Sequence, residues 1–115
     1  MIKLSVPGRP VPKSRPRTGQ GRVYTPARTR DYERAVKEVA QLSCKHPLEG
    51  ELWMSAHFYF SDNKAGDIDN YIKSIFDGME GVCFHNDRQI KVLEASIQQT
   101  DGLERAEVEV GEIST

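Results

Sequence analysis

The stretch ELWMSAHFYF, residues 51–60, alternates between apolar and more polar side chains along its whole length. One set would face a protein core: Leu52, Met54, Ala56, Phe58 and Phe60. The other set would face away from it: Trp53, Ser55, His57 and Tyr59. Because successive side chains of a strand point to opposite faces, this period predicts a long β-strand with one buried face.

Two helices are predicted on either side of this strand. The first runs from about Arg30 to Cys44, with Thr29 as its N-cap and His46-Pro47 beyond its end. Its apolar side comprises Tyr32, Val36, Val39 and Ala40. The second runs from about Asp69 to Met79, because apolar residues recur there at spacings of three and four. They are Ile68, Ile72, Ile75, Phe76 and Met79.

The remaining segments predict further strands. Short strands are expected at 2–6 and 21–25, and longer ones at 89–100 and 105–113. Asp101-Gly102 separates the last two, and this dipeptide favours a tight hairpin between them. The order of elements indicates an α+β fold, in which two helices pack on one largely antiparallel sheet. At 115 residues the chain is predicted to form a single domain, 1–115.

Charge is divided unevenly along the chain. Residues 1–37 hold ten basic and two acidic side chains, whereas residues 38–115 hold six basic and fifteen acidic ones. Five of the six prolines lie within the first 26 residues, between the first cations, and keep that segment extended. The asymmetry favours a polyanionic partner, although a basic arm paired with the acidic body of its own fold would show the same pattern.

Several classes of protein are disfavoured by the sequence. No apolar run approaches the roughly 20 residues that a membrane helix requires, so no membrane association is expected. No motif for an organic cofactor or a nucleotide is present. Cys44 and Cys83 lack the spacing of a zinc site or a disulfide framework, and we therefore expect a reducing, cytoplasmic location.

The segment GDIDNYIKSIFDG, residues 66–78, places carboxylates at the start of the second helix. Asp69, Lys73 and Asp77 follow at steps of four and share a face opposite the apolar stripe. Helix capping and an i,i+4 ion-pair ladder would explain these residues without any function. Asp67 gains little from the helix dipole, however, and two neighbouring carboxylates repel each other unless a cation joins them.

A third carboxylate follows in HNDRQ, residues 85–89. Asp87 lies there, just before a predicted strand. Mg²⁺ binds one or two protein carboxylates and completes its octahedron with water and substrate phosphate. We therefore predict a Mg²⁺ site formed by Asp67, Asp69 and Asp87, with Lys73 stabilising charge in the transition state of phosphodiester cleavage.

With these residues assembled, the chain resembles the RusA family of Holliday junction resolvases. The resemblance rests on GRPVPKSRPR (8–17), on GDIDNYIKSIFDG and on HNDRQI (85–90), in matching order and spacing. It implies an α+β homodimer that binds four-way DNA junctions and makes paired, symmetric nicks with Mg²⁺ in recombination and repair. By position, Asp67, Asp69 and Asp87 match the essential acidic residues of the family and Lys73 matches its lysine. Asn86 departs from the family, since many members have aspartate there.

The basic N-terminal segment is predicted to bind DNA phosphates, together with Lys73. The residues concerned are Arg9, Lys13, Arg15, Arg17 and Arg22. A homodimer would present two identical sites to a nearly two-fold-symmetric junction, and the second helix or the strand 51–60 are candidates for its surface. The alternatives are a structure-specific DNA-binding protein without cleavage and a nuclease acting on flaps or other branched DNA.

Overall fold

The computed structural model describes residues 1–14, 17–19, 22–24 and 26–113 of the chain. Its strands are β1 (Ile2–Pro7), β2 (Arg17–Gly19), β3 (Arg22–Tyr24), β4 (Leu52–Phe60), β5 (Ile90–Gln99) and β6 (Arg105–Glu112). Its helices are α1 (Ala27–Ser43), α2 (Ile68–Met79) and the 3₁₀ turn η1 (Asp87–Gln89). The predicted α+β class is confirmed, and the strand expected at 21–25 is β3, paired with β2 in a separate hairpin.

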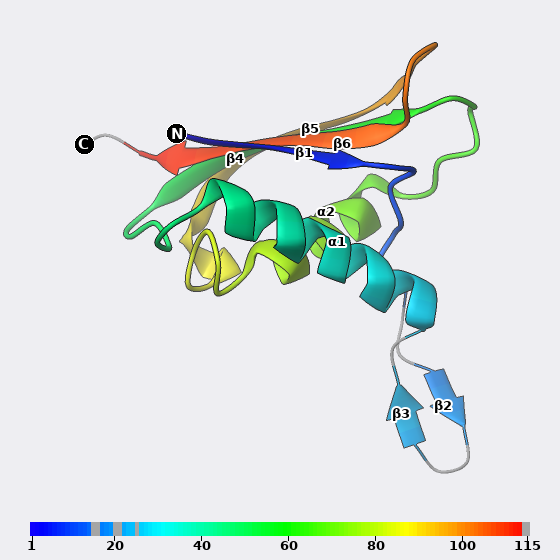
Figure 1. Ribbon diagram of the computed structural model, residues 1–115, viewed down its shortest axis with the longest axis horizontal. Coiled ribbons are helices and arrows are strands. Elements are labelled where there is room, and N and C mark those ends of the chain that lie inside the picture. Colours follow the sequence, from blue (N-terminus) through cyan, green and yellow to red (C-terminus); the bar gives the residue numbers. More distant parts are fainter. Residues whose placement is uncertain (15–16, 20–21, 25, 114–115) are drawn as a thin grey trace.

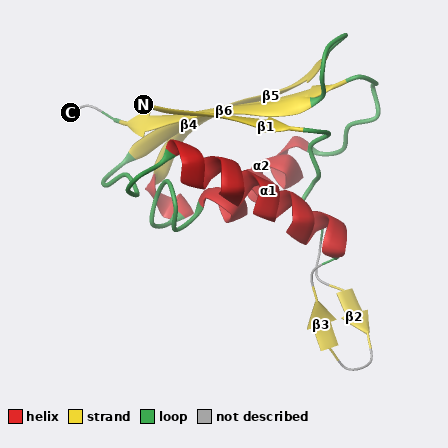
Figure 2. Ribbon diagram, in the orientation of Figure 1, coloured by secondary structure: helices red, strands yellow, loops and turns green. Residues whose placement is uncertain are grey.

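The main sheet has the order β1-β6-β4-β5, so β4 lies inside it (Figure 2). The predicted alternation of β4 is confirmed, because its five apolar positions are buried and the four between them are half-buried. Strand β6 runs antiparallel to both of its neighbours, whereas β5 runs parallel to β4. The sheet is therefore largely antiparallel with one parallel edge strand.

Both helices pack on the same face of the sheet (Figure 1). The predicted apolar side of α1 is confirmed, with Tyr32, Val36 and Ala40 buried. On α2 the buried stripe is rotated from the predicted one, because Ile75 and Met79 are buried but Ile68 and Ile72 are only half-buried. Tyr71, Ser74 and Gly78 complete the buried side of α2. Within the described residues no helix is long and apolar enough to cross a membrane.

The predicted hairpin at Asp101-Gly102 is wrong. Strands β5 and β6 lie on opposite sides of β4, and the loop between them passes the end of that strand. Gly102 does not have the positive φ that a two-residue type I′ turn requires; Gly8, Gly50 and Gly81 do. The physical reason is that the largely buried β4 takes partners on both edges, so a locally favourable turn signal is overridden.

The N-cap of the first helix also differs from the prediction. Helix α1 begins at Ala27, and Thr29 is a buried residue inside its first turn. The Thr29 hydroxyl donates to the carbonyl oxygen of Pro12 and accepts from the Ser14 N–H, both at 3.4 Å. Thr29 therefore fastens the N-terminal segment to α1 instead of capping the helix.

The two cysteines are joined in a disulfide, contrary to the prediction. Cys44 follows the last residue of α1 and Cys83 lies in the loop after α2, with 5.6 Å between their Cα atoms. They are 39 residues apart, and only the packing of the two helices brings them together. Sequence spacing carries no signal for such a pair. A reducing compartment would hold the pair as adjacent thiols, and the cytoplasmic location stays a prediction.

Candidate active site

The position of α2 follows from its place between the parallel strands β4 and β5. Strands β4 and β5 are parallel, and α2 connects them, so α2 runs back from the end of β4 toward the beginning of β5. Asp67 and Asp69 lie at the start of this helix. Lys73 lies one turn further along, on the face of α2 that is exposed to solvent.

The Asp67 and Asp69 carboxylates have no structural partner among the described residues. Asp67 occupies the N-cap position of α2, but its side chain forms no capping hydrogen bond. Both side chains are exposed, and no described cation lies within ion-pair distance of either. Helix capping therefore does not account for Asp67.

The ion-pair ladder considered for α2 is also absent from the described part of the chain. Lys73 pairs with neither Asp69 nor Asp77, and Asp77 instead lies 3.0 Å from the Lys13 ammonium. The Lys13 Nζ also donates to Glu33 on α1, at 2.7 Å. Lys73 is thus an exposed cation one turn from Asp69, on the same side of the helix.

Asp87 lies in the turn before β5. Its N–H donates to the Glu80 carboxylate at 3.4 Å, and its own carboxylate is exposed. Asn86 caps the 3₁₀ turn, because its Oδ1 accepts from the Arg88 N–H at 2.8 Å. Asparagine and aspartate cap helices about equally well, so either residue at position 86 could cap this turn.

Within one chain, Asp87 does not join Asp67 and Asp69. Glu80, which contacts Asp87, directly follows α2, and the 12 residues of the helix separate the two ends by about 18 Å. Among the residues the structure describes, no three His, Cys, Asp or Glu side chains converge on a common point. The sequence suggested a single cluster because spacing alone does not show that β4 and β5 are parallel.

Arg9, one of the predicted DNA-binding residues, forms ion pairs within the fold. Its guanidinium contacts Glu104 at 2.7 Å and Asp62 at 3.2 Å, and it lies over the Phe60 ring. The hydrogen bond to Asp62 raises the pKa of Arg9. The Lys64 N–H and Arg9 lower the pKa of Asp62, and the Ser61 N–H and Arg9 lower that of Glu104.

Lys13 is held in a similar way. Burial opposes its charge, but the hydrogen bonds to Glu33 and Asp77 outweigh this effect and raise the pKa of Lys13. The backbone N–H of Lys13 also donates to the Asn70 carbonyl oxygen at 2.8 Å. Lys13 therefore fixes the N-terminal segment against both helices.

The other predicted DNA-binding residues lie mostly beyond what the structure describes. Arg15 is outside the described residues, and for Arg17 and Arg22 only the backbone is placed, in the β2–β3 hairpin that extends from the start of α1 (Figure 1). The structure adds candidates that we did not select from the sequence. Arg28, Arg30 and Lys37 are exposed along α1, and none forms an ion pair with a described residue. At 100° per residue Arg30 and Lys37 share one side of α1, which the helical period could have shown, whereas Arg28 lies on the other side of the buried stripe.

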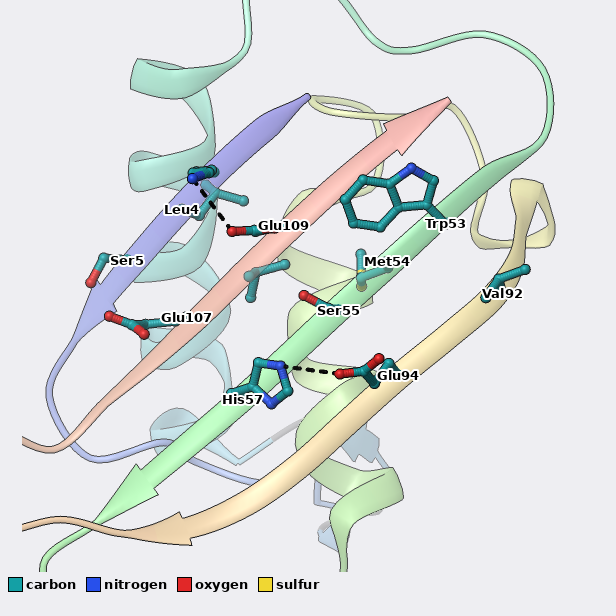
Figure 3. Close-up of a pocket in the computed structure, with 12 residues that line it drawn as sticks. Leu4, Ser5, Trp53, Met54, Ser55, His57, Val92, Glu94, Glu107 and Glu109 are labelled. Carbon is teal, nitrogen blue, oxygen red and sulfur yellow. Dashed lines mark ion pairs between the residues drawn. The ribbon is translucent and has the colours of Figure 1, made fainter. Parts of the chain in front are cut away.

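The opposite face of the sheet carries a hollow of about 880 Å³ (Figure 3). Trp53 and His57 project into it from β4, with Glu94 from β5 and Glu107 from β6. The His57 Nδ1 lies 2.6 Å from the Ser96 hydroxyl, and its Nε2 lies 3.8 Å from Glu94. The sheet separates this hollow from the acidic residues of α2.

Comparison with known proteins supplies the family. The family model described as Endodeoxyribonuclease RusA matches residues 7–111 of the 115. The chain belongs to the RusA family. The match includes all the residues predicted for the site, from Arg9 to Asp87. No curated protein matches the chain at a significant level.

Membership of the RusA family makes this chain a nuclease of the endodeoxyribonuclease type. The resemblance drawn from the three motifs is thereby confirmed, and DNA is its substrate class. The roles of individual residues, the metal and the type of DNA structure stay predictions.

Proposed function

We propose that this RusA-family protein is a Mg²⁺-dependent endonuclease that resolves Holliday junctions by paired, symmetric nicks during DNA recombination and repair. It would act as a homodimer without an organic cofactor, with Asp67, Asp69, Asp87 and Lys73 in its active sites. The family assignment supports cleavage of DNA. The paired carboxylates at the start of α2 support the assignment of the catalytic position.

The observation that carries this proposal is the state of Asp67 and Asp69. Two exposed carboxylates one residue apart repel each other, and the described structure offers them no cation and no capping bond. Such an arrangement costs stability unless something outside the fold binds to it. Their position within the GDIDNYIKSIFDG motif, in a nuclease family, favours a metal ion and a DNA phosphate as that binding partner.

The donor set fits magnesium. Asp67 and Asp69 offer only oxygen ligands, and one or two carboxylates are what Mg²⁺ usually takes from a protein. The chemistry that the ion supplies when bound is activation of water and stabilisation of the leaving oxygen. Lys73 lies on the same exposed side of α2 and would hold a non-bridging phosphate oxygen while charge accumulates there.

Asp87 can take part only if a second subunit contributes it. The length of α2 separates Asp87 from Asp67 in one chain, because η1 holds Asp87 near the end of α2 and Asp67 lies at its start. We therefore propose that Asp87 of the partner subunit completes each site. This arrangement would make cleavage depend on dimerisation and would give the two sites the symmetry of the junction.

DNA phosphates would be held by cations that the fold leaves exposed. Arg28, Arg30 and Lys37 on α1 meet that condition, and we propose them together with Arg15, Arg17, Arg22 and Lys73. Arg9 and Lys13 were predicted for the same role, and each is now engaged by two carboxylates. Arg9 and Lys13 would therefore either contact DNA while still paired with these carboxylates or hold in place the N-terminal segment that contacts DNA.

Nicking of a synthetic four-way junction at increasing Mg²⁺ concentration tests the proposal. We expect Asp67→Asn and Asp69→Asn to lower nicking by at least a thousandfold while junction binding survives. Glu112→Gln, which removes an exposed carboxylate at the far end of β6, is the matched control and should leave nicking unchanged. Nicking that continues in both aspartate variants would remove the metal site from α2.

The same assay separates the alternatives. Competition by flap and duplex DNA at fixed salt distinguishes a junction resolvase from a nuclease for other branched DNA. Junction binding that persists in EDTA, without nicks at any Mg²⁺ concentration, would indicate a binding protein without cleavage.

A further inference from the structure

The loop 61–67 carries the chain from the end of β4 to the start of α2 (Figure 1). The last backbone N–H before Asp67 is that of Gly66, and it donates to the Tyr71 hydroxyl at 2.8 Å. Tyr71 lies one turn inside α2, on the buried side of the helix. A side chain of the helix therefore holds the residue that directly precedes Asp67, a predicted metal ligand.

The Tyr71 ring is fixed by its packing. Tyr71 is 4% exposed, and its ring centroid lies 5.5 Å from that of Phe58 and 5.3 Å from that of Phe60. Both phenylalanines belong to β4 and are fully buried. Because a close-packed ring keeps one orientation, its hydroxyl oxygen is a hydrogen-bond acceptor at a fixed position.

Little besides this hydrogen bond fixes the position of Gly66. A Cβ added to Gly66 would have one near neighbour among the described atoms outside the adjoining residues, the Tyr71 hydroxyl oxygen at 3.6 Å. A hollow of about 250 Å³ borders the same loop at Asp62, Ala65 and Gly66. Packing therefore leaves this part of the loop open on one side, and the hydrogen bond to Tyr71 is what places it.

The backbone of Asp67 is held from its other side as well. Its carbonyl oxygen accepts from the Asn70 N–H at 3.2 Å, and the Asn70 carbonyl oxygen accepts from the Lys13 N–H at 2.8 Å. The Asp67 side chain forms no capping bond and stays exposed. The main chain is thus anchored while the carboxylate is left available. A ligand that is positioned in advance loses less conformational freedom when it binds an ion.

We propose that Tyr71 is a positioning residue for the metal site, and that its hydroxyl orients the Asp67 carboxylate by holding Gly66. The inference rests on the proposed function, since it takes Asp67 as a Mg²⁺ ligand. Tyr71 acts through the backbone and touches neither the metal nor DNA. Its contribution is one neutral hydrogen bond, so removing the hydroxyl should weaken metal binding about three- to tenfold.

Tyr71→Phe isolates this role, because it keeps the ring between Phe58 and Phe60 and removes only the hydroxyl. Tyr59→Phe is the matched control, since it removes the same group from the opposite face of the sheet. Hydrogen exchange followed by NMR reports on the hydrogen bond directly. The Gly66 N–H should exchange about tenfold faster in Tyr71→Phe than in the native protein or in Tyr59→Phe.

Binding of Mn²⁺ in the absence of DNA gives a second measurement, because Mn²⁺ takes the same oxygen ligands as Mg²⁺. Paramagnetic resonance of the free ion should show affinity about three- to tenfold weaker in Tyr71→Phe, unchanged in Tyr59→Phe and weaker still in Asp67→Asn. In junction nicking, the half-saturating Mg²⁺ concentration for Tyr71→Phe should rise by a similar factor, while the rate at saturating Mg²⁺ stays within about twofold of the native rate.

The three variants separate the possible failures. Native Mn²⁺ affinity in Tyr71→Phe, together with weakened affinity in Asp67→Asn, would overturn the positioning role and leave the metal site in place. Native affinity in both variants would refute the metal site of the proposed function and the positioning role with it. An equal loss in Tyr71→Phe and Tyr59→Phe would be a general effect of removing a tyrosine hydroxyl and would also overturn the proposal.

Discussion

Replacing Gly78 by alanine should destabilise the protein, although alanine favours helices. Gly78 lies in α2 where the helix meets α1. A Cβ at this position would lie 2.6 Å from both Cβ and Cγ1 of Val36 and 3.0 Å from the Glu33 carbonyl oxygen. The Val36 Cβ and the Glu33 carbonyl oxygen do not move when a side chain changes rotamer, so a rotamer change cannot relieve the contact. One helix must move away from the other.

Two opposing effects set the magnitude. Removing a glycine from a helix interior gains up to about 1 kcal/mol. Overpacking a well-packed contact costs about 1–3 kcal/mol. Because Val36 is 1% exposed and lies in the core, we expect the packing cost to dominate, with a net loss of about 1–2 kcal/mol.

Urea denaturation followed by circular dichroism measures this loss. With an m value of about 1–3 kcal/mol/M, the midpoint should fall by about 1 M. Gly102→Ala is the control, because its added Cβ would meet only Thr100 Oγ1 at 3.5 Å, and its midpoint should stay within about 0.3 M of the native value. An unchanged or raised midpoint for Gly78→Ala would show that α1 and α2 are not as close as the structure places them.

Two further predictions concern charged residues. Lys73→Ala should lower the nicking rate about a hundredfold and junction affinity less than threefold, because the exposed ammonium is assigned to stabilising the transition state. Single-turnover kinetics would measure the rate, and a binding titration would measure the affinity. A large loss of affinity with little loss of rate would instead make Lys73 a residue that binds phosphate in the ground state. The stability of the protein in acid should depend on Glu104, because the pKa of this side chain is lowered in the folded state. The unfolded state therefore binds a proton first, and the free energy of unfolding decreases as the pH falls below about 4. Glu104→Gln should make that loss less steep in acid titrations of unfolding, Glu112→Gln should not, and equal slopes in all three proteins would exclude Glu104 from the effect.

The sequence by itself determined the local features. The two-residue period of 51–60 and the three-and-four spacing of 68–79 specify β4 and α2, because backbone geometry repeats over neighbouring residues. The order and spacing of the acidic motif and its flanking segments predicted the RusA family, which the family match confirms. These signals need no knowledge of which elements become neighbours.

Only the tertiary structure decided how these pieces meet. The parallel pairing of β5 with β4 sends Asp87 to the far end of α2 from Asp67, whereas a hairpin between β5 and β6 would have been equally compatible with the local sequence. The ion pairs of Arg9 join residues 53 and 95 positions apart, and the disulfide joins residues 39 apart. Such contacts depend on which edges and faces remain available once the core has packed, and no local pattern encodes that choice.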